Sequence, residues 1–134
     1  MVKNLVVVIT GAAGRIGSAI AEAVILNGGK VIFVDVNKTS LEKITVGLDE
    51  KKFLTIVADA GIPEEADRCI KAGIEKFGYI DAAIHAAYPR SQCWGIRFEE
   101  IQQKHLNQDL SSHLGGAILF SQRILEFFKK QRHG

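Results

Sequence analysis

A glycine-rich turn, TGAAGRIG at residues 10–17, constrains the fold of this chain more than any other feature. It follows a run of β-branched residues at 5–9, which is typical of a strand buried on both faces. Small and apolar residues at helical spacing follow over 15–26 and stop at Asn27-Gly28-Gly29, a helix-ending turn. A buried strand, a tight turn and a helix in this order predict the start of a βαβ unit.

The rest of the chain continues the alternation of strand and helix. Further strands are predicted at 31–36, 53–58 and 80–87, and further helices at 40–46 with Ser40 as N-cap, at 63–77 with Pro63 in the first turn, and over most of 99–130. Right-handed crossovers then give an α/β fold, a Rossmann-type doubly wound parallel sheet with strand order 3-2-1-4. No linker is visible, so residues 1–134 are expected to form one domain.

Composition excludes several classes of protein. The 134 residues are 47% hydrophobic and 24% charged, as in ordinary globular chains, and the net charge of +2 is too small to indicate nucleic-acid binding. No apolar run reaches the ~18 residues of a membrane span, and the run at 5–9 is too short for a signal peptide. Cys69 and Cys93 lack metal-type spacing and are expected to be free thiols in a cytoplasmic protein. The four histidines form no metal-binding motif.

Each glycine of the turn has a predicted role in holding a dinucleotide. Gly11 lets the chain turn off the strand, Gly14 lets the backbone approach a pyrophosphate, and Gly17 lets the helix pack on the sheet. The N–H groups at the helix start, including Arg15 and Ile16, then face the phosphates. The alternative is a turn used only for tight packing of strand and helix.

Acidic residues close the second and third strands. Asp35 lies near the ~20-residue offset expected of an acid that binds the adenosine ribose, and its charge would repel a 2′-phosphate. The sequence therefore predicts NAD, with NADP as the weaker alternative because the Arg15 side chain could reach a phosphate. Asp59, followed by Ala60, could accept from an adenine amino group or cap the next helix.

With these motifs the chain resembles the short-chain dehydrogenase/reductase family along its whole length. The segment IDAAIHAAY at 80–88 resembles the family's fourth strand, with His85 and Ala86 in the positions of the Asn-Asn of Asn-Asn-Ala-Gly. The resemblance implies that the backbone at Ala86 and Ala87 lies against the nicotinamide ribose. His113 stands at the position of the family's catalytic Asn, with Gly116 and Gln122 at the expected offsets. A proton relay at His113 and a helical histidine without chemistry both stay open.

Two further features bear on activity. The loop AYPR at 87–90, Trp94-Gly95 and the later HLGG, FSQ and FFKKQ resemble dehydrogenases of flagellin glycosylation and nonulosonic acid pathways, which implies a sugar or sugar-nucleotide substrate. The family's fifth strand would begin at about residue 134, before its catalytic Ser and Tyr-x-x-x-Lys. Neither Tyr79 nor Tyr88 has a Lys four residues later. We expect the N-terminal portion of an NAD-dependent oxidoreductase; the alternative is a non-catalytic nucleotide-binding or interaction module.

The remaining expectations concern single residues and self-association. A structural role is favoured for His85, at a strand end, and an inert thiol for Cys93. The last helix is apolar around most of its circumference, at Leu114, Ala117, Ile118, Phe120, Ile124, Leu125, Phe127 and Phe128. Such a helix needs burial on two sides. A homo-oligomer is therefore expected, through this helix or through an uncovered edge of the fourth strand.

Overall fold

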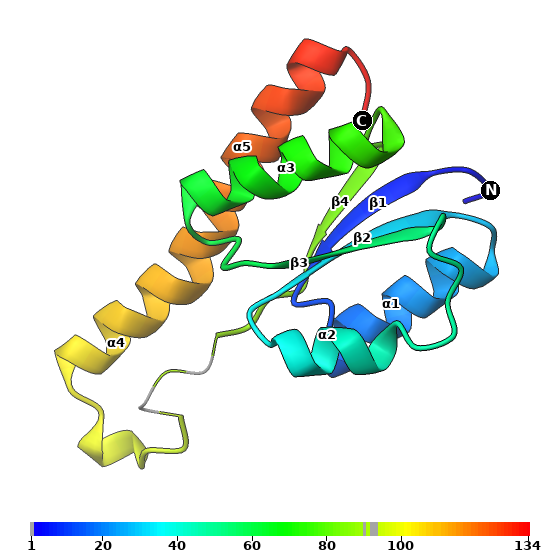
Figure 1. Cartoon of the computed structure of the whole chain (residues 1–134). Coiled ribbons are helices and arrows are strands. Elements are labelled where there is room, and N and C mark those ends of the chain that lie inside the picture. Colours follow the sequence, from blue (N-terminus) through cyan, green and yellow to red (C-terminus); the bar gives the residue numbers. More distant parts are fainter. Residues whose placement is uncertain (1, 90, 92–93) are drawn as a thin grey trace.

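Four parallel strands form the centre of the computed structural model, which describes residues 2–89, 91 and 94–134 (Figure 1). In chain order they are β1 (Val6–Thr10), β2 (Lys30–Asp35), β3 (Phe53–Val57) and β4 (Ala82–His85). Their order across the sheet is β3-β2-β1-β4, which confirms the predicted topology. Because the chain crosses from β3 at one edge to β4 beyond β1, the direction of strand addition reverses at β1, where ligands bind in sheets of this kind.

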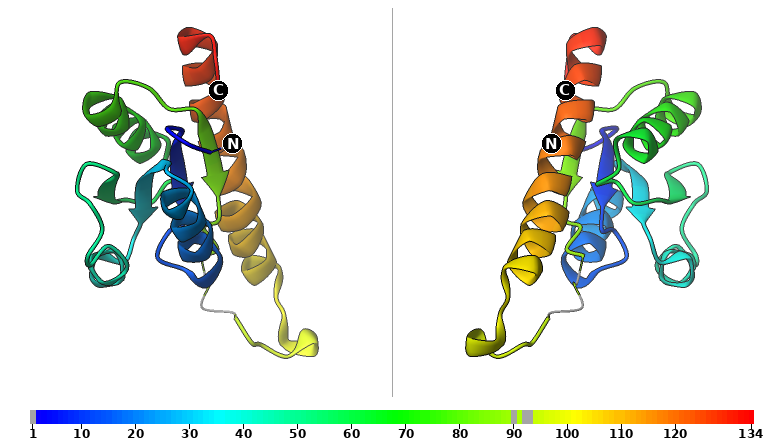
Figure 2. Two further views of the ribbon diagram at one scale, coloured as in Figure 1. Left: turned by 90° about the vertical axis from the view of Figure 1, so that its right-hand side faces the viewer. Right: turned by 90° about the vertical axis from the view of Figure 1, so that its left-hand side faces the viewer.

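Helices cover both faces of the sheet, as the two edge-on views in Figure 2 show. They are α1 (Arg15–Leu26), α2 (Lys38–Ile44), α3 (Pro63–Phe77), α4 (Gln103–Leu110) and α5 (Gly116–Gln131), with a 3₁₀ turn η1 (Phe98–Glu100) and a π-helical turn η2 (Ser111–Gly115). Helices α1 and α2 lie on one face, and α3 and α5 lie on the other. The structure is therefore the doubly wound α/β fold that was expected.

Alternating strand residues supply two separate cores. Val6 and Val8 of β1 point toward α3 and α5, where Phe120 is 2% exposed. Val7 and Ile9 point to the opposite face, toward α1 and α2. Since successive side chains of a strand point to opposite faces, an uninterrupted apolar run such as VVVI is what a strand between two helix layers requires.

Two predicted helices have the bounds that the sequence indicated, and α3 shows why. Pro63 lies at its start, Glu64 and Glu65 lie in its first turn, and Gly78 ends it with φ +86°. These residues suit the free N–H groups, the dipole and the left-handed end of a helix. Cys69 lies on the buried face of α3, where burial raises the pKa of its thiol to about 11. Cys69 is a free cysteine, as predicted, whereas Cys93 and Arg90 lie outside the described residues.

Several predicted boundaries differ from the observed ones: the first three strands by one residue at one or both ends, and α2, predicted at 40–46, by two. Ser40 is not the N-cap of α2: the cap is Asn37, whose side-chain oxygen accepts from the Ser40 backbone N–H at 3.0 Å. The fourth strand covers only Ala82–His85 of the predicted 80–87, and these four residues are the ones in register with β1. The predicted helix over 99–130 is divided into η1, α4, η2 and α5.

The helical arm that ends the chain extends beyond the sheet. In Figure 1, α4 continues the line of α5 away from the strands. The wide π-helical turn η2 joins the two, and π-turns occur often at functional sites. Leucines 106, 110 and 114 on this arm are exposed. Among the described residues, no helix is long and apolar enough to cross a membrane.

Candidate functional site

A cavity of about 650 Å³ opens at the carboxyl ends of the strands. All ten residues that the sequence analysis assigned to a cofactor line it: Gly11, Gly14, Arg15, Ile16, Gly17, Asp35, Asp59, Ala60, Ala86 and Ala87. They come from segments that follow all four strands of the sheet. A volume of this size is in the range of pockets that hold small molecules and cofactors.

Gly11 brings the turn after β1 against the backbone that follows β4. Its φ is +64°, and a Cβ placed on it would lie 2.5 Å from the carbonyl oxygen of Ala86 and 2.6 Å from the Cα of Ala87. Any side chain here would collide with backbone atoms that cannot move aside. The position therefore requires glycine for both its conformation and its packing.

Gly14 and Gly17 shape the start of α1. The Gly14 N–H donates to the Gly11 carbonyl at 3.0 Å, which closes the turn. A Cβ on Gly17 would overlap the Gly11 carbonyl oxygen and lie 2.9 Å from the Cα of Ala12. Gly17 is thus held against the turn itself, which differs slightly from the predicted contact between helix and sheet.

The helix start presents free backbone N–H groups to the cavity. The first bond of the helix runs from the Ser18 N–H to the Gly14 carbonyl at 2.9 Å, so the N–H groups of Arg15, Ile16 and Gly17 precede any intrahelical acceptor. In the described structure no side chain caps them. Three free donors at the positive end of a helix dipole, with no side chain on Gly14, fit a diphosphate.

Asp35 connects the turn to the end of β2. Its Oδ2 accepts from the Ala13 N–H at 3.0 Å, and its Oδ1 accepts from the Asn37 N–H at 2.9 Å. Each carboxylate oxygen has a second lone pair, so the group can accept from ribose hydroxyls without giving up these bonds. Sequence reasoning anticipated the acid but missed that it also holds the glycine turn.

Asp59 closes a tight turn after β3. Its Oδ1 accepts from the Gly61 N–H at 2.9 Å, and its own N–H donates to Glu65 Oε2 at 2.6 Å. The N-cap of α3 is Ile62, which makes no side-chain cap, so the alternative that Asp59 caps this helix was wrong. The side chain is exposed on the cavity wall, and its contact with adenine stays a prediction.

His85 joins the ends of β1 and β4. Its Nδ1 lies 2.9 Å from the hydroxyl oxygen of Thr10, a residue that is 1% exposed, and its ring lies 5.4 Å from the ring of Phe120. Burial lowers the pKa of His85 below its usual value, and the negative charge of Asp59 partly opposes this effect. The imidazole therefore favours its neutral form. These contacts give His85 the structural bond that was expected, although it also lines the cavity.

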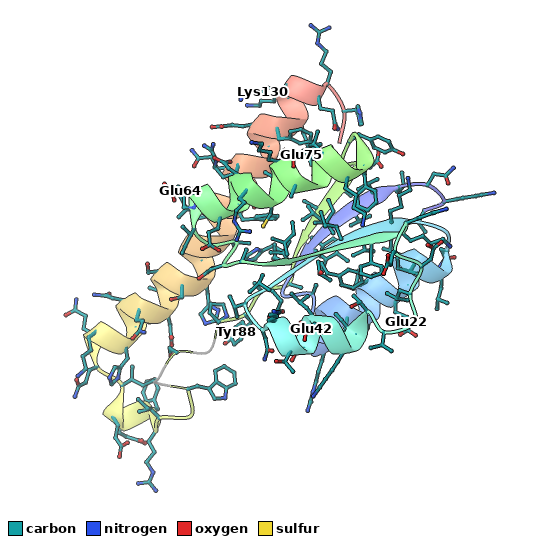
Figure 3. All side chains as sticks on the ribbon, in the orientation of Figure 1. Glu22, Glu42, Glu64, Glu75, Tyr88 and Lys130 are labelled. Carbon is teal, nitrogen blue, oxygen red and sulfur yellow. The ribbon has the colours of Figure 1, made fainter. Side chains whose placement is uncertain are left out.

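His113 lies in the π-helical turn rather than in the cavity wall. Its ring centroid is 4.0 Å from that of Tyr88, which lines the cavity and is labelled near the carboxyl ends of the strands in Figure 3. Its neighbour Ser112 and the nearby Gly116 also line the cavity. A role of His113 in proton transfer stays a prediction.

One close approach was missed by sequence reasoning. A Cβ on Gly61 would lie 3.3 Å from the Cα of Gly116, so the loop after β3 touches the first residue of α5. The pairing of two glycines far apart in the sequence carries no local signal. Among the described residues, no group of three or more His, Cys, Asp or Glu side chains is placed to hold a metal ion.

A family model described as short chain dehydrogenase matches residues 5–134 of this chain. Post-translational flagellin modification protein A of Campylobacter coli is 33% identical over 138 residues, a match that covers 100% of this chain and 54% of that protein. The 15-hydroxyprostaglandin dehydrogenase [NAD(+)] of Bos taurus is 32% identical over 137 residues, a match that covers 99% of this chain and 47% of that protein. The L-rhamnose-1-dehydrogenase of Scheffersomyces stipitis is also 32% identical, with 100% of this chain and 53% of that protein covered.

Solved structures agree with the fold. A short chain dehydrogenase from Bacillus anthracis superimposes with a TM-score of 0.87 at 25% identity, over 98% of this chain and 53% of that one. The chain thus spans about half the length of the curated relatives and of the structure that it matches.

Proposed function

Because this chain belongs to the short-chain dehydrogenase family, we propose that it is the NAD-binding portion of an oxidoreductase that moves a hydride between NAD and a hydroxyl or keto group. One observation carries the proposal: a turn that requires glycine at Gly11, three free N–H groups at the start of α1 and the carboxylate of Asp35 border the same cavity. Strand order and the position of the cavity at the reversal point support it further.

Different residues of this chain would bind different parts of the cofactor. The N–H groups of Arg15, Ile16 and Gly17 would hold the pyrophosphate, and Asp35 would accept from the adenosine ribose hydroxyls. Ala86 and Ala87 would lie against the nicotinamide ribose, and Asp59 with Ala60 would border the adenine. When bound, the nicotinamide supplies the hydride chemistry.

NAD is proposed as the cofactor in preference to NADP. The Asp35 carboxylate would lie beside the ribose 2′-oxygen, where a phosphate would be repelled. One relative, the bovine prostaglandin dehydrogenase, carries NAD(+) in its name. The exposed Arg15 guanidinium is the one group of the turn that could attract the extra phosphate of NADP.

A sugar is the proposed substrate class. Of the three relatives, one is named a rhamnose dehydrogenase, one a flagellin modification protein and one a prostaglandin dehydrogenase, so one name supports a sugar directly. His113 would act as a proton relay at the position of the family's Asn. Self-association of the chain through α5 or the β4 edge is part of this proposal, as is a cytoplasmic location.

A non-catalytic nucleotide-binding module is the second candidate. It would use the same cavity, whose lining residues suit the binding of a dinucleotide. Such a chain binds NAD without turnover. Substrate-dependent formation of NADH by the purified chain would contradict this second reading.

Calorimetric titration with NAD, and separately with NADP, tests the cofactor proposal. We expect binding of both with NAD tighter. Circular dichroism on the same sample establishes that the sheet and helices have formed. A folded chain that binds neither dinucleotide would contradict the assignment of the cavity.

A further inference from the structure

Three aromatic side chains meet beside the cavity, and of these three Tyr88 lines it. The ring of Tyr88 lies 4.0 Å from the ring of His113 and 5.4 Å from that of Trp94, centroid to centroid, and the Tyr88–Trp94 pair meets edge to face at 81°. Tyr88 and Trp94 are each 60% exposed. We call these three residues the aromatic rim. Exposed aromatic clusters are unusual because each ring buries a large apolar area when it is covered.

The aromatic rim is continuous with the cavity. Tyr88 and Pro89 line the cavity directly, and so does Ser112, the neighbour of His113. The backbone N–H of Trp94 donates to the carbonyl of Ser91 at 3.2 Å. Phe98, by contrast, is 86% exposed but does not border the cavity.

Tyr88 and His113 come from different parts of the fold. Tyr88 follows β4, and His113 lies in the π-helical turn η2. Their ring centroids lie 4.0 Å apart, with the ring planes tilted by 39°. The aromatic rim therefore joins the loop after β4 to the helical arm.

We propose that the aromatic rim is a stacking platform for the ring of a saccharide substrate. Aromatic faces carry negative charge density and attract the positively polarised C–H groups on the apolar face of a pyranose. The phenol, indole and imidazole also offer donors and acceptors to the hydroxyl groups at its edge. An acyl chain would instead need an aliphatic groove. This inference rests on the proposed function, because it makes the rim the substrate end of the cofactor cavity.

Binding of L-rhamnose as a probe tests the rim, by saturation-transfer NMR on the purified chain with and without NAD. We expect transfer strongest at the ring C–H protons, and no comparable signal from glycerol, which has hydroxyl groups but no ring face. Tyr88→Leu should weaken binding by about three- to tenfold, because stacking beyond area burial is worth about that much. Tyr88→Phe keeps the ring and should bind nearly as the unchanged chain does. Phe98→Leu, an exposed aromatic outside the rim, is the matched control.

Each outcome separates this inference from the proposed function. Loss of saccharide binding in Tyr88→Leu, with NAD affinity unchanged, supports the rim. Equal binding by Tyr88→Leu and the unchanged chain, or no binding at all, overturns it, whether or not NAD binds. A loss of NAD affinity in Tyr88→Leu without a change in saccharide binding also overturns it, because the ring would then contact the cofactor. Failure of NAD binding alone contradicts only the proposed function.

Discussion

The Asp35 carboxylate at the end of β2 lies 3.0 Å from the backbone nitrogen of Ala13 in the turn after β1. One side chain thus fixes the shape of the glycine turn and presents its remaining lone pairs to the cavity. The proposed phosphate-binding and ribose-binding parts of the site therefore share this one side chain. Any change at Asp35 should alter both the cofactor preference and the stability of the fold.

Replacement of Asp35 by alanine should weaken NAD binding and should reduce the ratio of the affinity for NAD to the affinity for NADP. It should also lower the free energy of unfolding by about 1–3 kcal/mol, since the N–H groups of Ala13 and Asn37 lose their acceptors. Asp35→Asn is the matched variant: it keeps an oxygen for one N–H but removes the charge. Calorimetry with both dinucleotides and urea unfolding measure the two effects. An unchanged NAD preference in both variants would show that Asp35 does not hold the ribose.

Gly11→Ala should destabilise the chain more than Gly47→Ala. Both residues have positive φ, +64° and +79°, so both variants incur the backbone cost of roughly 1 kcal/mol. Only at Gly11 would the new Cβ also collide with the backbone at Ala86 and Ala87, whereas Gly47 has nothing within 4 Å. Urea unfolding should show a loss at Gly11 at least about 1 kcal/mol larger. Equal losses would mean that the contact between the turn and the end of β4 is not tight.

Local patterns predicted most of the fold. The β-branched run of β1, and the proline and glycine at the two ends of α3, determine the structure of only the few residues around them. Such local effects can be read from the sequence. Ser40 failed as an N-cap because Asn37, three residues earlier, offers a competing side-chain oxygen. The π-helical turn was not predicted, because the segment is apolar around most of its circumference and a shift of one residue in the apolar spacing is not recognisable there.

The site divides in the same way. The glycine motif and Asp35 were predictable because their spacing along the chain is tied to a known unit of structure. The approach of Gly61 to Gly116 and the ring contact between Tyr88 and His113 were not, because they join segments that meet only after the sheet has formed. The Thr10–His85 bond belongs to this second group, since it depends on the register of β1 and β4.

Stability should fall at acid pH through His85. Its pKa is lower in the folded chain than in the unfolded one, so the unfolded state binds more protons between the two values. The free energy of unfolding should therefore decrease as the pH falls from about 6.5, the unfolded value, toward the folded one. In His85→Asn, whose amide can still bond to Thr10, this decrease of the free energy of unfolding with falling pH should disappear. Urea unfolding between pH 5 and 8 measures the free energy of unfolding of the unchanged chain and of the variant. The same pH dependence in both would rule out His85 as its cause.

Self-association should appear in light scattering at micromolar concentration. Ile118 and Leu125 lie seven residues apart on α5, hence on one face, and are 57% and 53% exposed. Strand β4 pairs only with β1 among the described strands, so its other edge offers unpaired N–H and C=O groups to a second copy. Both surfaces predict a dimer or larger species.

Paired lysine substitutions separate the two surfaces. Ile118→Lys with Leu125→Lys places two charges on the α5 face and should give a monomer if that face forms the contact. A dimer that persists would instead point to the β4 edge. Val46→Lys, at a residue 81% exposed in the turn after α2, is the matched control and should leave association unchanged. An unchanged chain that stays monomeric from micromolar to millimolar concentration would contradict both surfaces, because an apolar helix face and an open strand edge at such concentrations would each find a partner.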